Sequence, residues 1–315
     1  MYSLKKGAKV LITGGMGFIG SHLADRLVDG GVDVTIYDSQ ERKPYIPAGV
    51  KWAKGDIRDF ERLREECAGK DGIIHLAAVS RASAGYNDPL ACITANVVGT
   101  ANVLESIRRL GGNSWIILAS SRAVADELST GSNVQGVSSI YGVSKLAAEL
   151  FAMRFAQDYG LRVMALRFSE VYGSGRDNPD KVVPKLIMRA LQNLDLKLES
   201  PEQKFDFIHW ADIVNGIFLG IQHIEKAAKG YYDDFTLCTG QQTSLKELTS
   251  IILGETGARS KVIYSQGTVE KVDLPYPDPG KAETGIGFRA KVNLREGVRE
   301  TVEILKAGHR ANGTV

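Results

Sequence analysis

A glycine-rich segment between a predicted strand and a predicted helix constrains the fold of this chain most. The apolar run Val10–Thr13 is typical of a buried strand, and Ser21–Asp29 has the apolar periodicity of a helix. The segment that joins them, Thr13–Gly20, reads TGGMGFIG. In such a turn, glycines permit a tight bend, close approach of the backbone to a pyrophosphate, and packing of helix on strand. We therefore predict a dinucleotide site at this helix N-terminus, made by Gly14, Gly17, Phe18, Ile19 and Gly20.

The following residues repeat this alternation of short β-branched runs and longer amphipathic stretches. Further strands are expected at Val32–Tyr37, Gly49–Trp52, Gly72–Leu76, Ser114–Ala119 and Arg162–Phe168, and helices at Leu90–Leu110 and Ser139–Tyr159. Strands that are apolar on both faces and alternate with helices predict a parallel sheet covered on both sides. The predicted fold class is α/β, a doubly wound parallel sheet of the Rossmann type.

Glycines and prolines interrupt this pattern after about residue 170. We predict that residues 1–170 form the dinucleotide-binding domain and that residues 171–315 form a smaller C-terminal α/β lobe that binds the substrate. No polar linker separates the two, so we expect some later strands and helices to be interleaved with the first domain.

Composition excludes several classes of protein. The 39 Lys and Arg nearly balance the 37 Asp and Glu, which argues against a nucleic-acid partner. No apolar run reaches the roughly 18 residues that a membrane span needs, so no membrane partner and a cytoplasmic location are predicted. The three cysteines are scattered, and His209 and His223 lack ligand spacing, so no metal site is expected.

Asp38 ends the second predicted strand, near the interval of about 20 residues at which dinucleotide-binding folds carry an acidic residue. A carboxylate there accepts hydrogen bonds from the ribose hydroxyls of NAD and repels the extra phosphate of NADP. We therefore predict NAD as the cofactor, bound in part by Asp38 and Ser39. Arg42 and Lys43 lie nearby and are assigned to a solvated loop.

The candidate catalytic residues are Tyr141, Lys145 and Ser121. Tyr141 and Lys145 form a Tyr-x-x-x-Lys pattern, which places both side chains on one face of a helix. An adjacent ammonium lowers the pKa of a phenol, which makes Tyr141 a candidate base for an alcohol or sugar hydroxyl. Ser121 follows an apolar strand, and ligand groups gather beyond the carboxyl ends of such strands, so Ser121 is expected to share a proton network with Tyr141.

These motifs, in this order, resemble the extended short-chain dehydrogenase/reductases, specifically the NAD-dependent epimerase/dehydratase family typified by UDP-galactose 4-epimerase. The resemblance covers essentially the whole chain and includes TGGMGFIG, Gly55-Asp56-Ile57, HLAA from His75, NVVGT from Asn96, YGVSK, LRFSEVYG from Leu166 and FDFIHWAD ending at Asp212.

The resemblance implies further cofactor contacts. Asp56 and Ile57 would hold the adenine, Leu76, Ala77 and Ala78 would line the pyrophosphate and nicotinamide side, and Ser169 would also contact NAD. Asn96 would steady the catalytic region. Lys145 would bind the nicotinamide ribose while it tunes Tyr141.

The function that the resemblance implies is epimerisation of a nucleotide sugar by transient oxidation of a hydroxyl, most commonly at C4, with Tyr141 as the base. Two alternatives stay open. One is another oxidation-first enzyme of the family, a dehydratase, decarboxylase or ketone reductase. The other is a non-catalytic protein that binds the dinucleotide.

Departures from the family pattern concern the substrate side. Arg122 and Ala123 stand where dehydratases carry an acidic pair, and Ala125 and Asp126 replace the family's Tyr-Gly. Glu170 stands at the position of an Asn that binds the sugar-nucleotide phosphates, and Phe205 stands at that of an Arg. The substrate-binding candidates are therefore Arg81, Ser121, Arg122, Tyr141, Glu170 and Lys204. A homodimer is also expected, through the apolar outer stripe of the helix that carries Tyr141.

Overall fold

The computed structural model describes residues 5–40, 46, 48–124, 139–265 and 277–311. The chain divides into two compact units that interleave along the sequence. The first unit contains residues 1–168, 214–236 and 281–288, and the second contains residues 169–213, 237–280 and 289–315.

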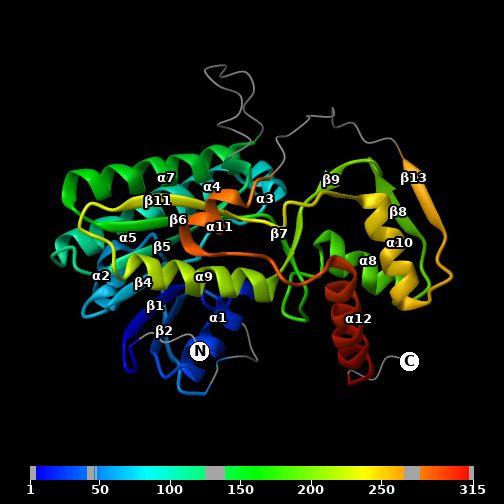
Figure 1. Cartoon of the computed structure of the whole chain (residues 1–315), viewed down its shortest axis with the longest axis horizontal. Coiled ribbons are helices and arrows are strands. Elements are labelled where there is room, and N and C mark those ends of the chain that lie inside the picture. The colour runs from blue at the N-terminus through cyan, green and yellow to red at the C-terminus, as the bar shows by residue number, and fades with distance from the viewer. Residues whose placement is uncertain (1–4, 41–45, 47, 125–138, 266–276, 312–315) are drawn as a thin grey trace. The chain divides into compact units, whose positions relative to one another are not determined.

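A seven-stranded sheet forms the centre of the first unit, in the order β11-β6-β5-β4-β1-β2-β3 (Figure 1). Every neighbouring pair from β3 to β6 is parallel. The strand order changes direction between β1 and β4, which is the point where open α/β sheets bind ligands. The strands are β1 Lys9–Thr13, β2 Asp33–Asp38, β3 Lys51–Lys54, β4 Gly72–His75, β5 Trp115–Ser121, β6 Arg162–Phe168 and β11 Tyr232–Leu237.

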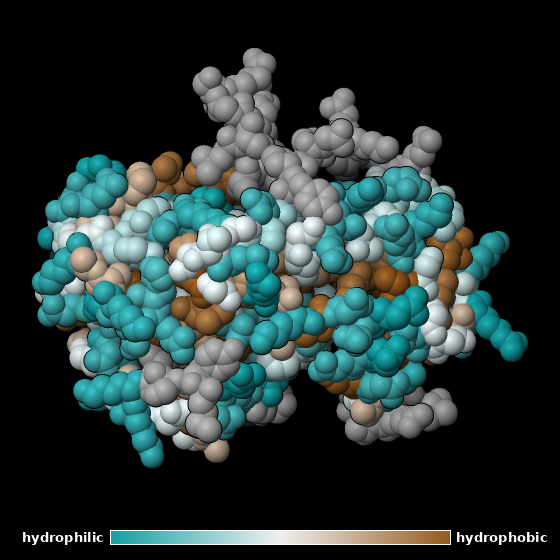
Figure 2. All heavy atoms as spheres, in the orientation of Figure 1, coloured by the Kyte–Doolittle hydropathy of each residue, from teal (hydrophilic) through white to brown (hydrophobic). Residues whose placement is uncertain are grey.

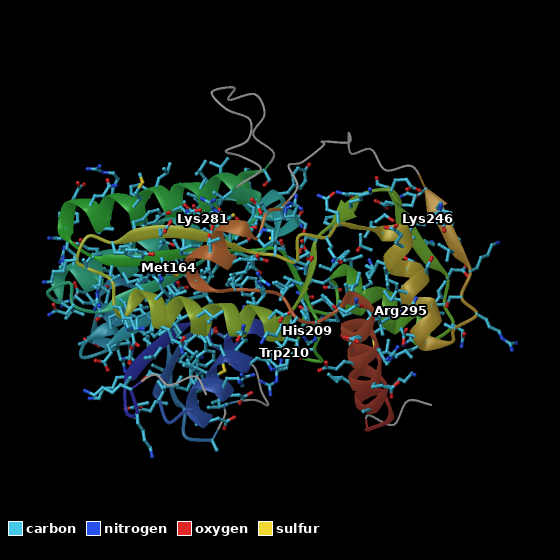
Figure 3. The ribbon with its side chains drawn as sticks, in the orientation of Figure 1. Met164, His209, Trp210, Lys246, Lys281 and Arg295 are labelled. Atoms are coloured by element: carbon cyan, nitrogen blue, oxygen red, sulfur yellow. The ribbon has the colours of Figure 1, made fainter. Side chains whose placement is uncertain are left out.

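Helices cover both faces of this sheet, as the apolar strands predict. On one face, α2, α5 and α7 share a buried core with side chains of the strands, among them Leu11, Ile73 and Ile116. On the other face lie α1 and α9 (Figure 1). The absence of a side chain at Gly220 lets α9 approach Met164, which is labelled in Figure 3, and Ile117. The helices of this unit are α1 Phe18–Asp29, α2 Phe60–Cys67, α3 Ala82–Asn87, α4 Pro89–Ile93, α5 Thr100–Arg109, α7 Ile140–Tyr159, α9 Trp210–Ile224 and α11 Gly280–Ile286.

The stretch predicted as one helix from Leu90 to Leu110 contains a π-helical turn, η1, at Thr94–Gly99 between α4 and α5. By length and composition alone, residues 89–109 are apolar enough to cross a membrane, a test that core helices also pass. In the structure, 44% of its most apolar window is buried.

The second unit packs helices α8 Val182–Leu191, α10 Leu245–Thr256 and α12 Leu294–Ala311 around its own apolar core. Its strands form three two-stranded sheets: β7 Glu170–Tyr172 with β10 Phe207–His209, β9 Lys204–Phe205 with β12 Thr243–Ser244, and β8 Leu196–Glu199 with β13 Val262–Ser265. Ser244 starts α10 with a complete capping box, in which Glu247 bonds back to the Ser244 amide. Hydrophilic residues cover most of the face shown in Figure 2.

A glycine in strand β4 offers a test of the packing within the first unit. A methyl group on Gly72 would lie 2.1 Å from the indole of Trp115 on β5, so Gly72→Ala is expected to destabilise the protein by about 1–3 kcal/mol. Adding Trp115→Leu should recover part of the loss. Gly308→Ala, on α12 in open space, should be neutral or slightly stabilising. Denaturant unfolding measures all three; an unchanged midpoint for Gly72→Ala would contradict the packing.

Candidate functional site

The glycine turn after β1 and the residues after β4 lie against each other at the carboxyl end of the sheet. Gly14 has a φ of +70°, and a Cβ there would approach the amide of Ala77 to 2.6 Å. A Cβ on Gly20 would lie 2.6 Å from the Gly14 carbonyl, whereas one on Gly17 would meet that oxygen at 3.1 Å. The close contacts therefore require glycine at 14 and 20. The backbone around Gly17 is less crowded than at these two positions.

Asp38 joins the glycine turn to the end of β2. Its carboxylate accepts hydrogen bonds from the Met16 amide at 3.0 Å and the Gln40 amide at 2.9 Å, and Ser39 follows directly. Helix α1 begins after Gly17 with no side-chain cap and no acidic residue in its first turn, which the structure describes in full. The N-terminus of α1 is thus suited to an anion.

Asp56 and Ile57 follow β3. The phenol of Tyr37 donates to the Asp56 carbonyl at 3.0 Å, and Arg58 holds the Asp56 carboxylate and lowers its pKa. Ile57 is buried, and its side chain lies over the glycine face of Gly99, where a Cβ would come within 2.4 Å. The π-helical turn that ends at Gly99 is therefore packed directly against this predicted cofactor residue.

Helix α7 brings Tyr141 and Lys145 to the end of β5. Ser139 caps the helix by accepting from the Gly142 amide, so Tyr141 lies in the first turn. The buried ammonium of Lys145 donates to the Ala119 carbonyl at 3.1 Å, two residues before Ser121. The Ser121 hydroxyl accepts from the Ala123 amide at 3.2 Å. The structure therefore brings Lys145, one helical turn after Tyr141, to the end of β5.

Asn96, inside the π-helical turn, connects three elements. Its side-chain oxygen accepts from the Val79 amide at 2.8 Å, and its NH₂ donates to the Val79 carbonyl at 3.0 Å and to the Ser144 hydroxyl at 2.9 Å. Ser144 in turn donates to the Tyr141 carbonyl at 2.8 Å. Asn96 thus fixes the chain after β4 and the first turn of α7, a role that π-helical turns at functional sites often serve.

The buried region around Lys145 and His75 favours the neutral forms of both side chains. Burial lowers the pKa of Lys145 to about 8, while the neighbouring Cys92 and Glu149 act in the opposite direction. Burial, followed by the charge of Lys145, lowers the pKa of His75 to about 3. His75 contacts the hydroxyls of Thr13 and Thr100 through its two ring nitrogens, so it is a neutral core residue.

The other predicted site residues divide between the units. Arg81 precedes α3, and the Arg122 amide donates to the Phe168 carbonyl, both in the first unit. Glu170 pairs in register with Phe207 and Lys204 with Ser244, both in the second unit, where Ser169 is buried. Positions 42, 43, 125 and 126 lie outside the described residues. Among those described, no group of three His, Cys, Asp or Glu residues could hold a metal ion.

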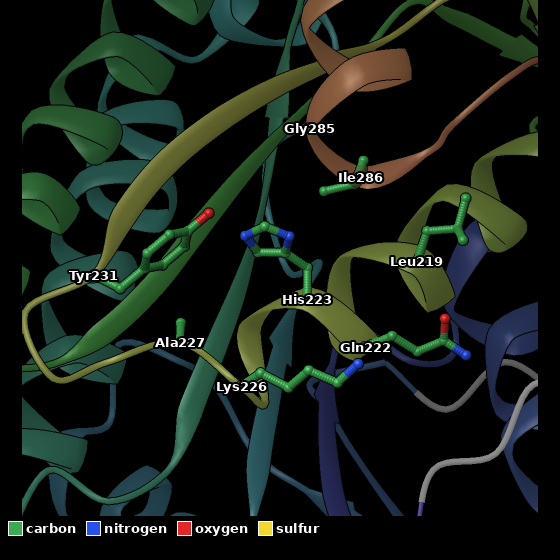
Figure 4. Close-up of a pocket in the computed structure, with 8 residues that line it drawn as sticks. All are labelled: Leu219, Gln222, His223, Lys226, Ala227, Tyr231, Gly285 and Ile286. Atoms are coloured by element: carbon green, nitrogen blue, oxygen red, sulfur yellow. The ribbon is translucent and has the colours of Figure 1, made fainter.

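A shallow pocket of about 400 Å³ lies between α9, the segment that leads from α9 to β11, and α11 of the first unit (Figure 4). His223 lies between Tyr231 and Ile286 in this view, and Gln222 and Lys226 line its edge. None of the predicted site residues lines it.

Comparison with known proteins decides the family. The model of the NAD dependent epimerase/dehydratase family matches residues 10–235. The chain belongs to this family. The resemblance seen in the sequence and the predicted Rossmann-type fold are thereby confirmed, and the family is NAD-dependent.

Curated relatives of this chain are named for several different activities. A putative UDP-glucose 4-epimerase of Methanocaldococcus jannaschii is 30% identical over 96% of this chain and 99% of its own length. A dTDP-glucose 4,6-dehydratase of Actinoplanes sp. is 27% identical over 96% of this chain and 98% of its own length. A UDP-glucuronic acid decarboxylase 1 of Xenopus tropicalis is 26% identical over 98% of this chain and 75% of its own length.

Solved structures agree with the fold. A UDP-glucose 4-epimerase of Thermotoga maritima, solved with UDP-glucose, has a TM-score of 0.84 at 26% identity and covers 95% of this chain and 99% of its own. MoeE5, solved with UDP-glucuronic acid and NAD, has a TM-score of 0.82 at 29% identity and covers 96% and 100%.

The glycine turn and its neighbours fit NAD. Glycine at 14 and 20 lets the turn pack closely against the Ala77 backbone and against itself, and α1 offers an uncapped N-terminus. The Asp38 carboxylate stands beside the turn, held by two backbone amides.

Burial of Lys145 generates a prediction about stability. Its pKa is about 8 in the folded chain against 10.5 ordinarily, so the protonated amine destabilises the fold below about pH 8, and this cost disappears as the pH rises towards 10.5. Lys145→Met should therefore stabilise the ligand-free protein by about 1–3 kcal/mol at pH 7 and by less at pH 10. Denaturant unfolding at both pH values measures this. Lys229→Met, on the surface, should change little; a less stable Lys145→Met at pH 7 would contradict the burial.

Proposed function

We propose that this chain is an NAD-dependent nucleotide-sugar epimerase that works by transient oxidation of a sugar hydroxyl at C4. The observation that carries the proposal is the placement of Tyr141 one helical turn from Lys145, whose ammonium is fixed at the end of β5. Such a pair is suited to removing a proton from a hydroxyl at neutral pH.

Each residue has a defined part in this proposal. Bound NAD would supply the hydride acceptor and donor. Gly14, Gly17, Phe18, Ile19 and Gly20 would bind its pyrophosphate, with the remaining predicted contacts at Asp38, Ser39, Asp56, Ile57, Leu76, Ala77, Ala78, Asn96, Lys145 and Ser169. The Tyr141 phenolate takes the proton of the C4 hydroxyl and, once the sugar has turned to present its other face, returns that proton to the C4 oxygen. Ser121 donates a hydrogen bond to that oxygen, and Lys145 stabilises the phenolate.

Epimerisation is favoured over dehydration by the residues after Ser121. Removal of water needs an acid and a base beside the reacting carbons, whereas this chain has Arg122 and Ala123 there. A cation at 122 suits an anionic substrate. We propose that Arg81, Arg122 and Lys204 bind the diphosphate and that Glu170 contacts the sugar.

Tyr141→Phe tests the assignment. Loss of the base should lower kcat by at least about 10²-fold while NAD binding is retained. Purified protein with NAD and UDP-glucose, followed by NMR of the sugar signals, measures turnover, and calorimetry measures NAD binding. Tyr159→Phe, on the exposed end of the same helix, is the matched control and should keep full activity. Undiminished turnover by Tyr141→Phe would refute the role of Tyr141.

The same NMR assay separates the family's activities when UDP-, dTDP-, GDP- and CDP-sugars are compared. A C4-inverted product supports the proposal. Loss of water or of carbon dioxide from the sugar, or net consumption of reduced cofactor, would replace it with a dehydratase, decarboxylase or ketone reductase.

We also propose that the chain forms a cytoplasmic homodimer through α4, η1 and α7. Large apolar side chains lie exposed on these elements, whereas Phe155, also on α7, packs against the core. The exposed set is Leu90, Ile93, Val98, Val143, Leu150 and Phe151. A second copy would cover this surface through the same helices, as two-fold interfaces do.

Leu150→Glu should place a charge in that interface and convert a dimer to a monomer. Light scattering coupled to size exclusion at micromolar concentration measures the mass. Tyr264→Glu, equally exposed on β13 of the second unit, should leave the dimer intact. A monomeric wild-type chain would remove the dimer proposal.

A further inference from the structure

A row of charges of alternating sign leads away from Lys145 through the first unit. Glu149 lies one helical turn after Lys145 on α7 and is buried. Arg167 of β6 donates to both of its carboxylate oxygens, at 2.9 and 2.6 Å. Arg167 also contacts Asp234 of β11 at 2.9 Å. These four residues alternate from positive to negative.

The row ends at the surface. Lys281, labelled in Figure 3, lies in the first turn of α11 and contacts Asp233 at 2.7 Å and Asp234 at 3.5 Å. The half-exposed Lys281 is the point at which the charges meet water. Each inner charge has a counter-charge beside it, which a buried ion requires.

The groups that face the Lys145 ammonium come from four elements. Helix α7 contributes Glu149, and β5 contributes the Ala119 carbonyl. Strand β4 contributes His75, which is neutral, and α4 contributes the thiol of Cys92. Among the described residues whose charge acts on the Lys145 ammonium, Glu149 is thus the one that carries a carboxylate.

We propose that Glu149 is a positioning residue of the reaction: its carboxylate, fixed by Arg167, supplies the buried negative charge that stabilises the Lys145 ammonium beside Tyr141. Arg167 orients the carboxylate and Asp234 balances Arg167, so a polar link connects the catalytic helix to β11. The inference rests on the roles proposed above for Tyr141 and Lys145.

The signs of the charges give the inference a specific consequence. Glu149→Gln removes the negative charge and leaves Arg167 as a second buried cation, so the pKa of Lys145 should fall by about one unit. Arg167→Gln leaves Glu149 un-neutralised, so the pKa of Lys145 should rise. A purely structural role would impair both variants without moving the titration in opposite directions.

The titration is measured by NMR on the ligand-free full chain with carbon-13 at lysine Cε, where the Lys145 signal is the one lost in Lys145→Met. Asp234→Asn, on the more exposed partner of Arg167, should lower the pKa by less than Glu149→Gln does. If Arg167→Gln does not fold, this graded pair of decreases replaces the opposite shifts as the expected result. Glu105→Gln, in a surface ion pair with Arg108, is the control and should shift nothing.

Activity adds a second readout. Deprotonation of Lys145 should lower kcat at alkaline pH. In Glu149→Gln this fall should begin at a pH lower by the same interval as the shift in the pKa of Lys145, with KM nearly unchanged. An unshifted Lys145 titration in both Glu149→Gln and Asp234→Asn would overturn the inference and leave the proposed function intact. Undiminished turnover by Tyr141→Phe would instead overturn the proposed function, whatever the titration shows.

Discussion

The buried ammonium of Lys145 is the charge around which the predicted site of the first unit is arranged. Its hydrogen bond to the Ala119 carbonyl fixes the start of α7 against the end of β5. Burial of a charge costs desolvation free energy, so the groups around the ammonium must offset that cost with hydrogen bonds or negative charge, and no further cation can lie directly beside it. His75 stays neutral, and Asn96 holds Ser144 and therefore the first turn of α7. The elements that form the predicted site are thus ordered around one charge.

The sequence predicted those parts of the fold that local patterns determine. The glycine turn, the parallel strands up to β6 and the Tyr-x-x-x-Lys helix all depend on the spacing of a few neighbouring residues. The shape of the turn could also be anticipated, because only glycine permits the contact between position 14 and Ala77. The predicted strand Gly49–Trp52 ends two residues before the end of β3, and Val32–Tyr37 ends one residue before the end of β2, since strand ends depend on pairing partners.

Other features depend on contacts between distant residues, which local patterns do not encode. The apolar periodicity from Leu90 to Leu110 reads as one helix, because a π-helical turn adds one residue per turn without a change in composition. Strand β11 joins the sheet from residues after 230, where its acidic pair Asp233–Asp234 obscures the strand pattern. Glu149 and Arg167 lie on different elements, so their pairing was invisible until β6 packed beside α7.

Oxidation and re-reduction at one carbon is the central claim, and a labelled sugar tests it most directly. UDP-glucose with deuterium at C4 would be incubated with the protein and NAD in ordinary water, and the product would be examined by NMR and mass spectrometry. The account predicts a C4-inverted sugar that keeps its deuterium at C4, because the hydrogen that leaves the carbon returns to it on the other face. An inverted product that has exchanged the label for solvent hydrogen, or a product changed at another carbon, would contradict it.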